Sequence, residues 1–91
     1  MKAIWKFPLE FAPVQTVEMP QGASLLCVQM QGGIPCLWAL VYPEATREAR
    51  RLRMVGTGHA YHDSDLFCEY VGTFQMQDGG LVFHVFSEAM F

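Results

Sequence analysis

Hydrophobic and polar positions alternate along much of this chain with the two-residue period of half-buried β-strands. The alternation is clear over residues 2–7, where Ala3, Trp5 and Phe7 share one side. Further strand-like segments follow at 14–19, 25–31, 51–55, 67–77 and 81–87. Residues 36–41 contain no polar position. An uninterrupted apolar strand is covered on both faces, so we expect this one to lie centrally in a sheet.

A glycine-turn pattern occurs twice. Gln-Met-Gln precedes Gly32 and Gly33 in the first copy, and Gln-Met-Gln-Asp precedes Gly79 and Gly80 in the second. A glycine pair supplies the positive φ angles that a tight hairpin requires, and apolar strand-like residues flank both copies. Each copy therefore predicts a β-hairpin.

Residues 43–50 have helical features instead. Pro43 is near the first helical position, Glu44 lies in the first turn, and Arg47 and Arg50 lie toward the end, which suits one or two helical turns. Together, these segments predict a single, mainly β (β-rich α+β) domain over residues 1–91. We expect a compact antiparallel sandwich or barrel of seven short strands, with one short helix after the fourth strand.

Composition changes the picture in two ways. Apolar residues make up 52% of the chain and charged residues only 16%, which is a high apolar content for a domain of 91 residues with a large surface relative to its volume. We therefore expect a homo-oligomer. The net charge of −3 argues against general nucleic-acid binding, because phosphate neutralisation requires a basic surface.

Cysteine usage and hydropathy predict the compartment. The chain has three cysteines: Cys27, Cys36 and Cys68. An odd number cannot all pair within one chain, and Lys6 and Pro8 interrupt any secretory signal. The longest apolar run, residues 34–42, is far shorter than the ~20 residues that span a bilayer. We expect a reduced, intracellular protein without a membrane segment.

Residues 51–61 carry the groups best suited to anion binding. Successive backbone N–H groups in a glycine turn can bind phosphate, and neighbouring guanidinium groups can hold it bidentately. A tyrosine nearby could stack on a base. The predicted ligand-binding residues here are Arg51, Arg53, Gly58, His59 and Tyr61. The alternative is that the glycines only turn the chain and the arginines only solvate a strand.

The loop that follows carries metal-ligand types in His59, His62 and Asp63. Their spacing matches no closed metal-binding framework, so we favour a solvated loop and predict neither a metal nor a cofactor.

His84 lies in an otherwise apolar strand and shares a face with Val82 and Phe86. The simplest interpretation is a core or interface histidine bonded to a backbone carbonyl, and ligand binding is the alternative. No serine or cysteine lies on a recognisable nucleophile turn, so we predict that the protein is not an enzyme. Were it one, His59, His62 and His84 would be the acid–base groups.

Several motifs together resemble a family of small proteins encoded by tailed bacteriophages and prophages. They lie at residues 5–10, 28–31, 35–41, 56–59, 72–75 and 81–86. The resemblance implies a non-enzymatic binding protein of the host cytoplasm that inhibits or sequesters a host component, either a defence protein or a nucleotide signal. The alternative that it leaves open is a structural or assembly protein of the virion. It supplies no site residues.

Overall fold

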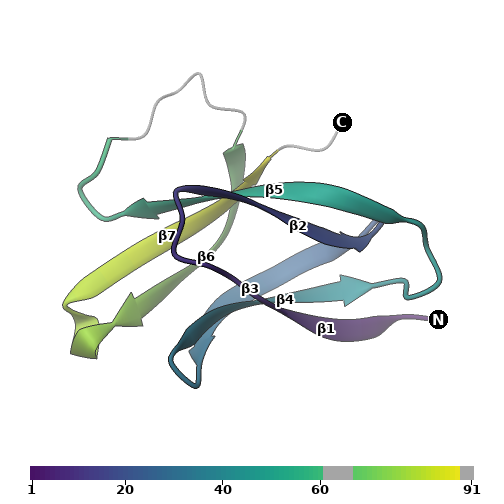
Figure 1. Ribbon diagram of the computed structural model, residues 1–91, viewed down its shortest axis with the longest axis horizontal. Coiled ribbons are helices and arrows are strands. Elements are labelled where there is room, and N and C mark those ends of the chain that lie inside the picture. Colours follow the sequence, from purple (N-terminus) through teal and green to yellow (C-terminus); the bar gives the residue numbers. More distant parts are fainter. Residues whose placement is uncertain (61–66, 89–91) are drawn as a thin grey trace.

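The computed structural model describes residues 1–60 and 67–88 and shows a mainly β protein (Figure 1). The described residues form seven strands in two antiparallel sheets. The first sheet has the order β1 (Ala3–Pro8), β4 (Ile34–Val41), β3 (Ser24–Gln31). The second has the order β2 (Val14–Pro20), β5 (Arg47–Gly56), β7 (Leu81–Glu88), β6 (Phe67–Met76). The expected antiparallel β architecture is confirmed, in the form of two packed sheets.

The apolar strand β4 lies centrally, as its sequence predicts, because β1 and β3 pair with its two sides. Leu37, Ala39 and Val41 are fully buried between the sheets. On β1 the predicted alternation is also present, with Ala3, Trp5 and Phe7 packed against the core.

Both predicted hairpins are present. Gly32 and Gly33, at φ angles of 58° and 80°, connect β3 to β4. The second hairpin joins β6 to β7 through a short 3-10 turn, η1 (Gln77–Gly79). There Gln77 and Asp78 adopt positive φ angles together with Gly79, whereas Gly80 does not.

The predicted helix over residues 43–50 is wrong. Residues 42–46 form a turn, in which the Ala45 amide donates to the Tyr42 carbonyl at 3.0 Å, and β5 begins at Arg47. Because β5 pairs with β2 along 47–53, the sheet supplies backbone hydrogen bonds that an isolated short helix cannot match. Within the part of the chain that the structure describes, no α-helix follows the fourth strand.

The two sheets approach each other closely at one point. A Cβ atom built on Gly72 of β6 would lie only 2.8 Å from the backbone nitrogen of Val28 on β3. Both are edge strands, so this contact closes one side of the sandwich. Only a residue without a side chain fits there.

Cys27 and Cys36 carry free thiols, and the side chain of Cys68 lies outside the described residues. No helix among residues 1–60 and 67–88 has the length and apolarity needed to cross a bilayer.

Candidate functional site

The exposed side of the four-stranded sheet carries several of the predicted site residues. In the pairing register, Arg53 of β5 lies opposite Phe86 of β7, which in turn lies opposite Tyr70 of β6. Inward-facing neighbours, such as Leu52 and Val85, are buried in the core. We call this surface the outer face and define it by Arg51, Arg53, Tyr70, Thr73, His84 and Phe86.

The outer face combines positive charge with aromatic rings. The Arg51 guanidinium lies 3.9 Å from a carboxylate oxygen of Glu88, and the Arg51 side chain is 49% exposed. Such an exposed ion pair contributes less than about 1 kcal/mol, so an anionic ligand can compete with it. Tyr70 is 60% exposed and packs edge-on against Phe86, with ring centroids 5.6 Å apart.

Two threonine hydroxyls hold the His84 ring. Its Nδ1 lies 2.9 Å from the Thr73 Oγ1, and its Nε2 lies 2.7 Å from the Thr57 Oγ1. The Tyr70 hydroxyl extends this chain by lying 2.5 Å from the same Thr73 oxygen. The hydrogen-bond partners of the His84 ring are therefore side chains and not the expected backbone carbonyl. The ring is fixed in place on the outer face.

The turn after β5 brings two more predicted residues to this region. Gly58 adopts a φ angle of 85°, and the His59 amide donates to the Gly56 carbonyl at 3.0 Å. Gly58 and His59 line a shallow pocket of about 300 Å³ together with His84 and Phe86. The structure thus places these residues together, and Arg53 lies beside the same Phe86.

The remaining loop predictions concern residues 61–63. Tyr61, His62 and Asp63 lie outside the described residues. Among residues 1–60 and 67–88, no group of three or more histidine, cysteine, aspartate or glutamate side chains could hold a metal ion.

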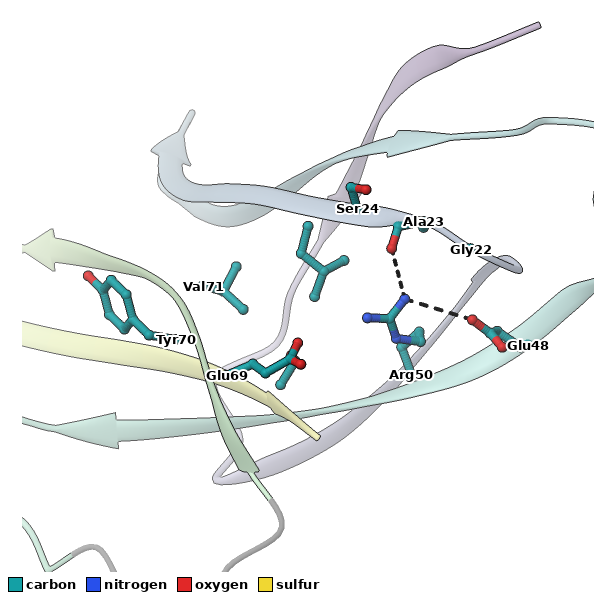
Figure 2. Close-up of a pocket in the computed structure, with 10 residues that line it drawn as sticks. Gly22, Ala23, Ser24, Glu48, Arg50, Glu69, Tyr70 and Val71 are labelled. Atoms are coloured by element: carbon teal, nitrogen blue, oxygen red, sulfur yellow. Dashed lines mark hydrogen bonds and ion pairs between the residues drawn. The ribbon is translucent and has the colours of Figure 1, made fainter. Parts of the chain in front are cut away.

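Sequence reasoning missed Arg50. This residue is only 6% exposed and lines a pocket of about 420 Å³ together with residues of β3, β6 and β7. Its Nη1 donates to the Ala23 carbonyl at 3.1 Å and lies 3.8 Å from a Glu48 carboxylate oxygen (Figure 2). The spacing of Arg50 from Leu52 and Met54 already marks it as inward-facing in a strand. The expectation of a helix through residue 50 concealed that spacing.

Comparisons with known proteins give a family. No curated protein matches the chain, and no solved structure does. Residues 1–90, almost the whole chain, match the model of one family, and the protein therefore belongs to the family described as a domain of unknown function (DUF7352).

Proposed function

We propose that this protein is a non-enzymatic binding protein, and that its outer face takes a small anionic ligand with an aromatic ring, such as a nucleotide. The observation that carries the proposal is the row formed by Arg53, Phe86 and Tyr70 across three paired strands. Arg51 and the fixed ring of His84 lie on the same face.

Each part of this surface matches a part of such a ligand. A guanidinium group can donate two parallel hydrogen bonds to a phosphate, and it remains charged at any physiological pH. An exposed aromatic ring offers a stacking surface for a base. Strand pairing fixes the backbone spacing between Arg53, Phe86 and Tyr70, so the three side chains start from neighbouring positions on one face.

A thermal-shift screen against nucleotides and cyclic nucleotides, followed by calorimetric titration, tests the proposal. A ligand present at 100 times its Kd adds about 2.7 kcal/mol to the free energy of unfolding, which is easily detected. The decisive variant is Arg53→Gln. Its matched control is Arg47→Gln, which removes an exposed arginine from the other end of β5, where the guanidinium lies over Trp5.

We expect Arg53→Gln to weaken binding by at least about tenfold, the loss of one charge-assisted contact, while Arg47→Gln leaves it within about twofold. Equal losses in both variants would show that overall charge, and not the outer face, attracts the ligand. The absence of a thermal shift with every nucleotide would refute the proposed ligand class.

The wider role that we propose is inhibition or sequestration of a host component by this binding. Its support is the resemblance of the sequence motifs to phage proteins. A gene position among early host-takeover genes would favour it. Detection of the protein in purified particles by mass spectrometry would favour a virion component instead.

A further inference from the structure

The Arg50 pocket contains a buried cation with unused hydrogen-bond donors. A guanidinium group has five N–H donors. Among the described residues, the polar contacts of the Arg50 side chain are those that its Nη1 makes with the Ala23 carbonyl and Glu48. Its Nε and Nη2 therefore have no partner in that part of the chain. A buried donor without a hydrogen-bond partner is unfavourable, so these donors favour an acceptor from outside.

A cavity lies next to these donors. It is bounded by residues 22–25 at the start of β3, by residues 69–71 of β6, and by Ser87 of β7. The volume of about 420 Å³ falls within the range of about 300–1,000 Å³ that is typical of small-molecule sites. It lies beside the close approach of β3 and β6 at Gly72.

Two carboxylates flank the buried cation. Figure 2 shows Glu48 on one side of Arg50 and Glu69 on the other, with the Tyr70 ring directed away. The buried Ser87 hydroxyl donates a hydrogen bond to a Glu69 carboxylate oxygen at 3.5 Å. With one arginine and two glutamates, the side chains lining the pocket carry a net charge of −1.

This arrangement selects among ligand charges. A simple anion would satisfy the Arg50 donors but would meet two carboxylates, and like charges in a partly desolvated site repel. A simple cation would pair with the glutamates but would leave the Arg50 donors unused. A zwitterion satisfies both, provided that its two charges are close together.

We propose that this pocket binds a free α-amino acid, with its carboxylate on the Nε and Nη2 of Arg50 and its ammonium group on the carboxylate of Glu69. Ala23, Leu25 and Val71 add apolar lining, which suits an uncharged side chain. This inference is independent of the outer face and of any nucleotide.

Calorimetric titration of the intact protein with the individual L-amino acids tests the proposal. Each amino acid that binds is compared with the amine and the carboxylic acid that each lack one of its charges. We expect at least one amino acid with an uncharged side chain to bind with a Kd below about 1 mM, and both analogues to bind at least about tenfold more weakly. If either analogue binds as well as the amino acid, or if no amino acid binds, the proposal is overturned.

Two glutamine variants locate the site. Glu69→Gln removes an exposed pocket carboxylate, and Glu88→Gln removes a carboxylate that instead pairs with Arg51 on the outer face. We expect Glu69→Gln to weaken amino-acid binding at least about fivefold and Glu88→Gln to leave it unchanged. Equal affinity in Glu69→Gln and the wild type would overturn the assignment, as would an equal loss in both variants. Thermal melts of both variants show that the fold is retained.

Discussion

Replacement of Gly72 by alanine tests the close contact between the two sheets. The added Cβ would lie 2.8 Å from the Val28 nitrogen, whereas ordinary contacts begin at 3.4 Å, so the two strands must separate by about 0.6 Å. Overpacking of this kind costs about 1–3 kcal/mol. A backbone atom cannot rotate away, which favours the upper half of that range. The loss of unfolded-state entropy returns about 0.4–1 kcal/mol. The expected net loss is about 2 kcal/mol.

Urea denaturation and thermal melting measure this change. For a domain of this size, about 2 kcal/mol corresponds to a fall in Tm of roughly 10 °C.

Gly33→Ala is the comparison, because that position has a positive φ angle but no atom within 4 Å of the added Cβ. It should cost about 1–2 kcal/mol through backbone strain alone. The Gly72→Ala variant should also change the Arg50 pocket, since Val71 lines it. A Gly72→Ala protein as stable as the wild type would refute the close packing of β3 on β6.

Three further predictions follow from the fold. Nucleotide binding at the outer face should weaken in calorimetric titrations as the salt concentration is raised from 50 to 500 mM, because Arg51 and Arg53 are near the surface, where salt screens charges. An affinity that does not change with salt would contradict an electrostatic site. Leu37→Ala, at a fully buried position in β4, should lower the free energy of unfolding by about 3 kcal/mol in urea denaturation, and a loss below about 1 kcal/mol would show that Leu37 is not in a packed core. Ile4→Lys should reduce self-association in sedimentation experiments, because Ile4 is 63% exposed and lies opposite Leu40 in the first sheet, whereas Thr16→Lys on β2 should not. A wild-type monomer at micromolar concentration would refute the expected oligomer.

Strand positions could be predicted because each strand leaves a local pattern. The alternation on β1 and the unbroken apolar run of β4 depend only on neighbours in the chain. The error over residues 43–50 has the same origin. Pro43 and Glu44 favour a helix locally, but the pairing of Arg47 with Pro20 depends on a strand far away in the sequence. Local preference could not reveal that partner.

Part of the candidate site could also be predicted, because strand period depends only on neighbouring residues in the chain. Strand period alone placed Arg51 and Arg53 on the exposed side of their strand, whereas it favoured a core or interface position for His84. The threonine partners of His84 depend on register, and β6 shifts its register by one residue between Tyr70 and Gly72. That irregularity leaves no clear trace in the sequence, since glycine there also suits a turn. The contact of Thr73 with His84 could therefore be found only in the structure.

The place of β7 has a consequence for how the protein is made. It is the last strand in the described part of the chain, yet it lies between β5 and β6 inside the four-stranded sheet (Figure 1). During translation, the edges of β5 and β6 that pair with β7 therefore stay unpaired until residues 81–88 leave the ribosome. A nascent chain that stalls before that point would expose both edges together with apolar residues of the core, which favours aggregation.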